Sequence, residues 1–210
     1  YMSSGFFGSY VDLEGVYRTE FELIKRYREM AIHPECDSAI EDIVNEAIVS
    51  DSNDQPVELD LNHLNASDGI KKKIRDEFKY IKELLDFDAK AHEIYRNWYI
   101  DGRLYYHKVI DRESPRKGIT ELRYIDPTKL RKVKEIEEKE DPKTGAKIIT
   151  KQEEYFIFQD KKMGDHNQGV KIHPDAIIYC TSGQLDPSRS RVLSYLHKAI
   201  KPVNQLRMME

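Results

Sequence analysis

The sequence contains no run of about 20 apolar residues, which is the length that a membrane-spanning helix requires. Its first residues, Tyr1 to Gly5, lack the basic and apolar blocks of a signal peptide. Only two cysteines occur, Cys36 and Cys180, and they form no paired-cysteine motif. This predicts two free, buried thiols in a reducing cytosol rather than a disulfide scaffold. The sequence therefore argues against a secreted or membrane-spanning chain.

Motifs for nucleotide binding and for acyl transfer are also missing. Gly164, Gly169 and Gly183 form neither a phosphate-binding loop nor a dinucleotide fingerprint, because no glycine-rich strand–turn–helix unit surrounds them. The dipeptide Ser182-Gly183 lacks the glycine two residues before the serine that a nucleophile elbow needs. We therefore expect no bound cofactor and no nucleotide hydrolysis.

The seven histidines and the many carboxylates offer few metal-ligand spacings. His33 and Cys36 are three residues apart and could share a helical turn, but two ligands do not make a zinc site and no second pair lies at ligand spacing. We expect no catalytic residue, no metal site and no enzymatic activity. A metal-dependent nuclease stays open as an alternative, which would require histidines and acids between positions 33 and 111 to meet in space.

Charge is plentiful but nearly balanced. The chain of 210 residues has 34 Lys and Arg against 38 Asp and Glu, a net charge of -4 and an isoelectric point near 6.0. This balance removes any basic field over the whole molecule, so we expect no tight, sequence-independent grip on DNA. Hydrophobic residues make up 39% of the chain, which is enough for the core of one or two domains.

The first half of the sequence has helical periodicity. Residues 1–12 mix Gly, Ser and aromatic side chains and predict an extended arm. Residues 13–102 predict a helical part with one short strand at 57–61, and Gly102 is placed to stop the last helix. The helices expected there are Leu13 to Ala31, Glu35 to Val49, Ile70 to Leu85 and, after a break at Phe87-Asp88, Ala91 to Ile100.

After Gly102 the pattern alternates as in strands, so residues 103–182 predict a small antiparallel sheet or an SH3-like barrel. The strands expected are Leu104 to Ile110, Ile119 to Ile125, Leu130 to Ile136, Ile148 to Phe158 and Ala176 to Cys180. Residues 183–210 predict the start of a long helix, kinked by Pro202 and truncated at its end. Helices, then a sheet, then a helix indicate the α+β class, and we expect the chain to be a fragment of a longer protein.

Distinctive strings occur along nearly the whole chain, at Tyr1 to Leu13 (YMSSGFFGSYVDL), Leu23 to Val49, Tyr95 to Asp111 (YRNWYIDGRLYYHKVID), Leu122 to Ile136 and Leu196 to Glu210. Together these strings resemble the portal, or head-to-tail connector, proteins of T-even-type contractile-tailed bacteriophages. The resemblance is weakest between Lys139 and Gly169. It implies that the chain is the wing region of such a protein, with the helix after Leu193 leading toward the stem.

The resemblance also implies a function and a set of partners. Portal proteins of this kind form a ring of twelve copies at one vertex of the phage head, and double-stranded DNA passes through it without sequence recognition. The ring nucleates head assembly beside the major capsid protein, docks the large terminase subunit and later holds neck and head-completion proteins. The expected location is the virion, and the host cytoplasm during assembly. A stand-alone β-barrel adaptor that binds peptide or nucleic acid is a third interpretation.

A ring subunit must offer two different surfaces to identical neighbours. We expect exposed aromatic side chains to serve as contacts between subunits, with burial in the protein's own core as the competing interpretation for each; the candidates are Phe6, Phe7, Tyr10, Tyr17, Trp98 and Tyr99. Basic residues of the last helix, Lys198, Lys201 and Arg207, are candidates for the side of the DNA channel. The cluster Lys71-Lys72-Lys73 with Arg75 is interpreted as a solvated helix face.

Overall fold

The computed structural model describes residues 13–49, 55–140, 147–159, 169–187 and 191–209, so the predicted arm over residues 1–12 lies outside the described residues. The helices are α1 (Leu13–Met30), α2 (Pro34–Ala47), α3 (Asp68–Leu84), α4 (Phe87–Asp101) and α5 (Ile200–Arg207). The strands are β1 (Arg103–Ile110), β2 (Ile119–Ile125), β3 (Leu130–Glu140), β4 (Lys147–Phe158), β5 (Val170–Ile172) and β6 (Ile177–Thr181). Helices and strands are segregated along the chain, which confirms the α+β class. In the described part of the chain, no helix is long and apolar enough to cross a membrane.

Helices α1, α2 and α4 pack together with the C-terminal segment around one hydrophobic core. Apolar residues three or four positions apart place one face of α1 in this core, where Tyr27 is fully buried. Pro34 is the first residue of α2, a position that needs no backbone N–H donor. The buried members of this core are Tyr27, Met30, Ala31, Ile40, Val44, Ile100, Leu196 and Val203.

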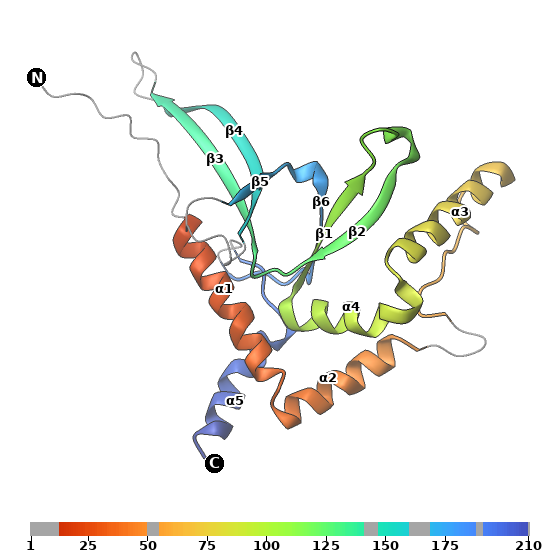
Figure 1. Cartoon of the computed structure of the whole chain (residues 1–210). Helices are drawn as coiled ribbons and strands as arrows, with labels where there is room; N and C mark the ends of the chain where they lie inside the picture. The colour runs from red at the N-terminus through yellow and green to blue at the C-terminus, as the bar shows by residue number, and fades with distance from the viewer. Residues whose placement is uncertain (1–12, 50–54, 141–146, 160–168, 188–190, 210) are drawn as a thin grey trace, which may run out of the picture.

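Two residues with left-handed backbones bound α4. Asp86 (φ 49°) separates α3 from α4, and Gly102 (φ 72°) ends α4. The predicted stop at Gly102 is confirmed, whereas the predicted break at Phe87-Asp88 is in fact at Asp86, because aspartate tolerates the left-handed region that interrupts the helix. This turn lets α3 rise away from the rest of the helices, as Figure 1 shows.

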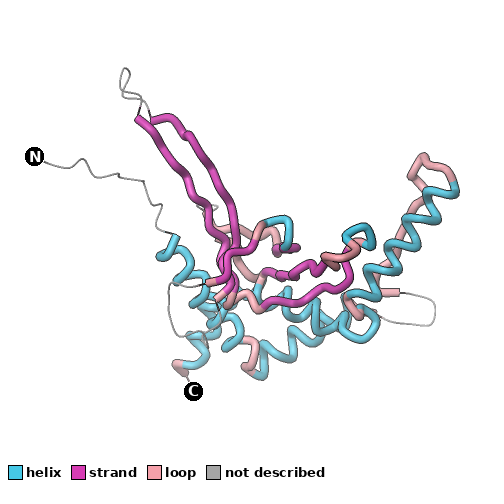
Figure 2. Tube along the Cα trace, turned by 45° about the horizontal axis from the view of Figure 1, so that its top comes forward, coloured by secondary structure: helices cyan, strands magenta, loops and turns pink. Residues whose placement is uncertain are grey.

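The strands form two separate three-stranded antiparallel sheets with the orders β2-β1-β6 and β3-β4-β5. In the first sheet Tyr105 lies opposite both Ile125 and Tyr179. The second sheet contains the long β3–β4 hairpin, which projects from the body in both views (Figures 1 and 2). Both sheets contribute to a second core, which consists of Tyr105, Ile125, Leu130, Phe156 and Ile177.

Two predictions about the β structure were wrong. The sheets do not close into an SH3-like barrel, because among the described strands the ladders of one sheet do not continue into the other. Residues 57–61 are not a strand, because an alternating sequence becomes a strand only when a neighbour pairs with it. The five strands expected between residues 103 and 182 are confirmed with small shifts of their ends, and β5 was not predicted.

The C-terminal segment differs from the predicted long helix. Residues Tyr195–Ala199 form a 3₁₀ helix, η3, and α5 follows from Ile200. Pro202 therefore lies in the first turn of α5, where its missing N–H costs nothing, rather than kinking a continuous helix. The predicted C-terminal helix is thus present from Tyr195 to Arg207, whereas the predicted kink at Pro202 was wrong for this reason.

Candidate functional site

The helices and the sheets are joined at a network of charged residues around Arg28. The Arg28 guanidinium donates to the Asp101 carboxylate through Nε (2.9 Å) and Nη2 (2.7 Å). It also donates to Asp126 through Nη1 (3.1 Å) and Nη2 (3.0 Å). One side chain of α1 thus holds the end of α4 and the turn between β2 and β3. Such two-pronged contacts fix orientation as well as distance.

The two carboxylates of this network sit in different surroundings. Burial raises the pKa of the Asp101 carboxyl, and the hydrogen bonds from Arg28 oppose that rise. Partial burial of Asp126 also acts to raise the pKa of its carboxyl. Hydrogen bonds from Arg28 and Thr128 outweigh this effect and hold the pKa below its ordinary value. Asp101 is only 2% exposed, so water can replace its contact with Arg28 less easily than it can replace the contact between Asp126 and Arg28.

Gly102 and Arg103 continue the junction on its other side. A Cβ at Gly102 would lie 2.8 Å from the carbonyl oxygen of Leu193, so the backbone of the C-terminal segment passes directly against the end of α4. Arg103 is buried, and its guanidinium contacts Glu20 of α1 (3.1 Å) and donates to the carbonyl of Val192 (2.6 Å). Burial acts to lower the pKa of Arg103, but Glu20 holds it above its ordinary value.

The aromatic candidates Trp98 and Tyr99 lie against the chain's own C-terminal segment. Tyr195 stacks on Tyr99 with ring centres 5.1 Å apart and lies 5.3 Å from Trp98. Both candidates are half-buried, so each keeps an exposed part. Their intramolecular stacking does not test whether a neighbouring subunit contacts that exposed part, and the assignment as subunit contacts stays a prediction.

The C-terminal basic candidates lie on η3 and α5. Lys198 and Lys201 are exposed. Arg207 is exposed as well, and its Nε donates to Nε2 of His33 at the corner between α1 and α2 (2.9 Å). A second contact, between the Tyr27 hydroxyl and Nδ1 of His197 (2.8 Å), anchors η3 to α1. These contacts hold the last described residues against the helices, and whether the lysines face DNA stays a prediction.

Four of the predicted contact residues have no described side chain. Phe6, Phe7 and Tyr10 lie outside the described residues, and Tyr17 lies in the first half of α1, where the structure describes the backbone alone. Their assignment as subunit contacts therefore rests on the sequence.

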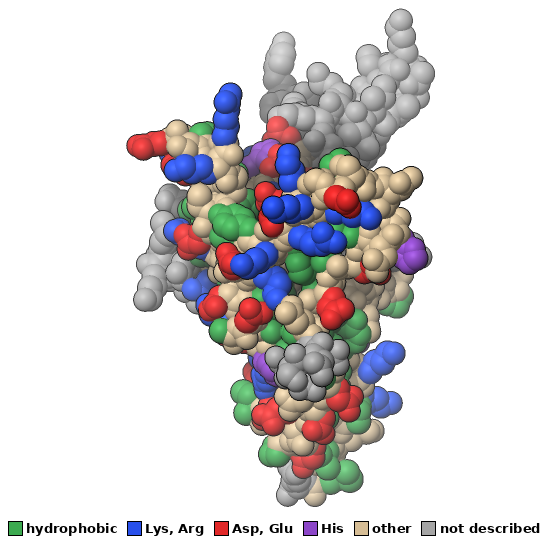
Figure 3. All heavy atoms as spheres, turned by 90° about the vertical axis from the view of Figure 1, so that its right-hand side faces the viewer, with side chains coloured by type: hydrophobic (Ala, Val, Ile, Leu, Met, Phe, Trp, Pro, Cys, Tyr) green, Lys and Arg blue, Asp and Glu red, His purple; other side chains and the backbone are tan. Residues whose placement is uncertain are grey.

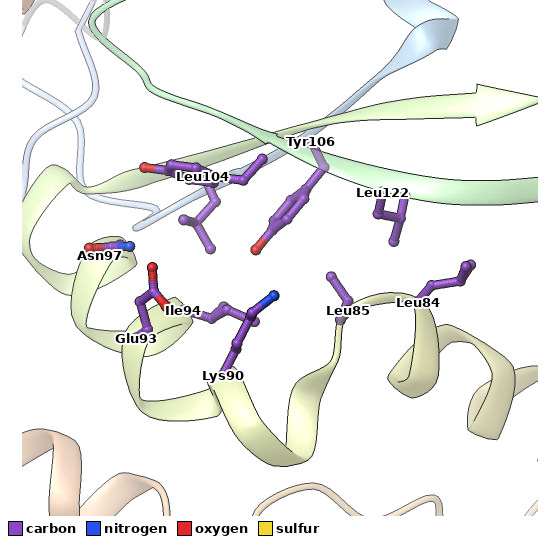
Figure 4. A pocket seen from close by; sticks show the side chains of 10 residues that line it. Leu84, Leu85, Lys90, Glu93, Ile94, Asn97, Leu104, Tyr106 and Leu122 are labelled. Carbon is purple, nitrogen blue, oxygen red and sulfur yellow. The ribbon is translucent and has the colours of Figure 1, made fainter.

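No cluster of three or more His, Cys, Asp or Glu with the geometry of a metal site occurs among the residues that the structure describes. A cavity of about 200 Å³ lies between α4 and the first sheet. Figure 4 shows Leu104, Tyr106 and Leu122 of the sheet facing Leu85 and Lys90 across it. The cavity is small, its walls are polar and apolar in about equal parts, and its lining does not identify a ligand.

Both cysteines are free, as predicted, but they are not both buried. Cys36 is half-buried, and burial raises the pKa of its thiol. Cys180 is exposed and lies on β6, the edge strand of its sheet.

The residues that organise the junction were missed from the sequence. Arg28 and Asp101 are 73 residues apart, and Arg28 and Asp126 are 98 residues apart. The one signal available was the string Tyr-Ile-Asp-Gly-Arg at residues 99–103, which places two charged residues around a helix-ending glycine.

Comparisons with known proteins show which family this chain belongs to. The family described as "Bacteriophage T4-like portal protein (Gp20)" matches residues 20–210. A relative named "Portal protein" from Vibrio phage KVP40 is 36% identical over 203 residues, covering 90% of this chain and 38% of the relative. Another of the same name from Salmonella phage ViI is 28% identical over 212 residues, covering 94% of this chain and 38% of the relative. The chain thus spans well under half the length of these relatives.

Proposed function

Because this chain belongs to the T4-like phage portal protein family, we propose that it forms part of the wall of the portal vertex ring, through which DNA enters and leaves the head. The family match over residues 20–210 is the observation that carries the proposal. As a portal protein, the chain is part of a structural virion component and not an enzyme.

The proposed ring contains twelve copies and acts by geometry. It nucleates head assembly next to the major capsid protein, docks the large terminase subunit during packaging and then holds the neck and tail proteins. In this proposal residues 13–102 are the helical part of the wing, residues 103–182 its β part, and residues 183–210 lead toward the stem. The arm over residues 1–12 extends to a neighbouring subunit.

The junction around Arg28 supports a role as a rigid wall. A ring subunit must hold its two contact surfaces at a constant angle, since a small error per subunit accumulates around the ring and prevents closure. Arg28 and Arg103 are each held by groups from more than one element, so the helices and the sheets are fixed to one another. This geometry suits a part that transmits position rather than one that opens and closes.

The test is to express the full-length protein that contains this chain, measure its size at low and high salt, and image it by electron microscopy. The expected result is a ring-shaped particle with a central channel. A full-length protein that stays monomeric under every condition, or that cleaves DNA with a stoichiometric bound metal ion, would overturn the proposal. The second outcome would favour the nuclease alternative.

A further inference from the structure

Helix α3 carries a hydrophobic stripe that the rest of the described chain covers only in part. Ile70, Ile74, Phe78 and Ile81 recur at intervals of three and four residues and therefore share one face. Yet no residue of α3 is buried, and Ile70 and Ile81 are 53% and 48% exposed. A surface helix with such a stripe normally buries it. Ile74 and Phe78 are half-buried, so the described residues leave the stripe open chiefly at Ile70 and Ile81.

The attachment of α3 explains why its stripe is left open. The helix contacts α4 near its C-terminal end, and the Tyr80 hydroxyl donates to the carbonyl of Ile119 in β2 (2.9 Å). From there α3 rises away from the body of the molecule (Figure 1). Its N-terminal two turns, with Ile70 and Ile74, are the part farthest from α4.

Basic side chains flank this stripe. Residues 68–84 contain six Lys and Arg and four Asp and Glu. Lys71 and Lys73 border the stripe on its two sides, since they lie one and three positions after Ile70, and Glu77 lies one turn after Lys73 on the same side. Lys79 and Lys82 pair with carboxylates of the same chain, whereas Lys71 and Lys73 have no such partner among the described residues. Figure 3 shows basic side chains gathered at the height of α3 on this end of the molecule.

Helix α2 has the opposite charge. Residues 34–47 contain five Asp and Glu and no Lys or Arg. On the outward face of α2, Ala39, Ile43 and Ala47 form a row of small or half-buried apolar side chains. Asp42 and Glu46 border this row, are exposed and have no basic partner among the described residues. Acidic side chains accordingly predominate at the height of α2 in Figure 3.

We propose that the stripe of α3 packs against the outward face of α2 in a second copy of this chain. Both rows, Ile70-Ile74-Phe78 and Ala39-Ile43-Ala47, have a spacing of four residues, and two such rows interdigitate in the commonest packing of helices. The alanines of α2 allow close approach, and the lysines that border the stripe of α3 meet the acids that border the row of α2.

The proposed contact between α3 and α2 rests on the proposed ring function, and it names the surfaces through which neighbouring copies would meet. Within one chain, α2 lies below α4 and α3 rises from its beginning, so the two faces are different patches of the surface (Figure 1). A contact between two different patches of identical chains is head-to-tail, and it yields a ring when the rotation closes. The contact thereby supplies the two unlike surfaces that a ring subunit needs.

A charge exchange in the full-length protein tests the contact. One variant carries Lys71→Glu with Lys73→Glu, a second carries Asp42→Lys with Glu46→Lys, and a third combines all four. Each of the first two should reduce the fraction of protein in rings by at least about tenfold at fixed concentration, because like charges then face each other. The third should recover most of the assembly, because the attraction is restored with reversed sign.

The matched control is Arg116→Glu with Lys117→Glu, which changes the net charge by the same amount at two exposed residues of the β1–β2 hairpin. It should assemble as the unchanged protein does. Equal loss in the control and in the α3 variant would overturn the proposal, as would rings that are unaffected by either reversal. If the unchanged protein forms no rings, the proposed function fails first, so the two failures are distinguishable.

Cross-linking provides a readout that does not depend on the strength of assembly. A protein with Lys73→Cys and Glu46→Cys should form disulfides between chains and give a ladder of covalent oligomers on a denaturing gel. Proteins with only one of these two changes should give no ladder, which controls for the native Cys36 and Cys180. Rings of the double variant that yield no covalent oligomers on oxidation would contradict the proposal.

Discussion

Arg28 and Asp101 lie 73 residues apart in the chain and meet through two hydrogen bonds, Nε to Oδ1 at 2.9 Å and Nη2 to Oδ2 at 2.7 Å. The Asp101 side chain is almost fully buried, so its charge depends chiefly on the hydrogen-bonded Arg28 guanidinium for compensation, with a smaller contribution from Arg103. The contact ties the last turn of α1 to the end of α4, next to the start of the first sheet. It is therefore the contact whose loss we expect to loosen the whole fold.

Replacing Arg28 with methionine should lower the free energy of unfolding by about 2 kcal/mol, since a buried carboxylate would lose its partner. The value is below the range for fully buried pairs because the Arg28 side chain is 37% exposed and partly screened by solvent. Chemical denaturation followed by circular dichroism measures the change. Arg26→Met, at an exposed position of the same helix, is the control and should shift the value by less than about 0.5 kcal/mol. Equal effects of the two substitutions would contradict the assigned role.

Two glycines with positive φ separate backbone strain from steric overlap. Gly102 (φ 72°) and Gly183 (φ 75°) have nearly the same conformation, but a Cβ at Gly102 meets backbone atoms at 2.8 Å and one at Gly183 meets open space. Gly183→Ala should lower the free energy of unfolding by about 1 kcal/mol, because only the strain of the left-handed backbone region is added. Gly102→Ala should cost clearly more, because Leu193 must also move. Similar melting temperatures for the two variants would show that the C-terminal segment does not press on the end of α4.

Buried tyrosines predict a loss of stability at high pH. Burial raises the pKa of Tyr105. The ring of Tyr179 stacks on Tyr105 with ring centres 4.8 Å apart, and the pKa of Tyr179 is raised as well. A pKa higher in the folded than in the unfolded chain leaves stability intact below about pH 10 and removes it as the pH rises further. Absorbance at 295 nm should therefore show a fraction of the phenols ionising together with the loss of circular dichroism.

The substitution Tyr105→Phe isolates this effect. It keeps the ring that packs edge-on against Phe156 and removes the ionisable group. Its alkaline transition should move to higher pH than that of the unchanged protein. Ionisation of every tyrosine near pH 10 without any loss of structure would argue against buried phenols.

Tyr195 links the C-terminal segment to α4 and can be followed through the single tryptophan of the chain, Trp98. Tyr195→Ala removes the ring that stacks on Tyr99 and should cost about 2 to 3 kcal/mol. The same change should shift Trp98 fluorescence to longer wavelength, because water reaches the indole. Tyr195→Phe keeps the ring and loses only the hydrogen bond to the Ser182 carbonyl (3.3 Å), so its emission should be unchanged. A red shift in both variants would assign the effect to the hydroxyl instead.

Residues 103–182 alone should not form a stable unit. Arg103 at their first position is buried only because Glu20 and the backbone of Val192 compensate its charge, and both lie outside the segment. The turn after β2 likewise loses Arg28, which binds Asp126. We expect this segment to show little amide-exchange protection, whereas an independent β adaptor domain would be well protected and would bind its ligand alone.

The sequence determined the local elements, because their signals act within a few residues. Helical spacing predicted α1 to α4 with ends that differ by a few positions, and Gly102 stops α4 as expected. Alternation predicted five of the six strands, and β5, with only three residues, was too short to show a pattern. The strings that resemble portal proteins predicted the family that the comparisons show.

Only the tertiary structure decided which elements meet. The alternating residues 57–61 found no strand to pair with, and the two sheets did not join into a barrel, since pairing depends on neighbours far away in the chain. Arg28, Asp101 and Asp126 carry no common local pattern, and their contact exists because α1 packs beside the junction of α4 and β1. The helical spacing of α3 was visible in the sequence, but only the fold showed that the described residues leave Ile70 and Ile81 of its stripe exposed.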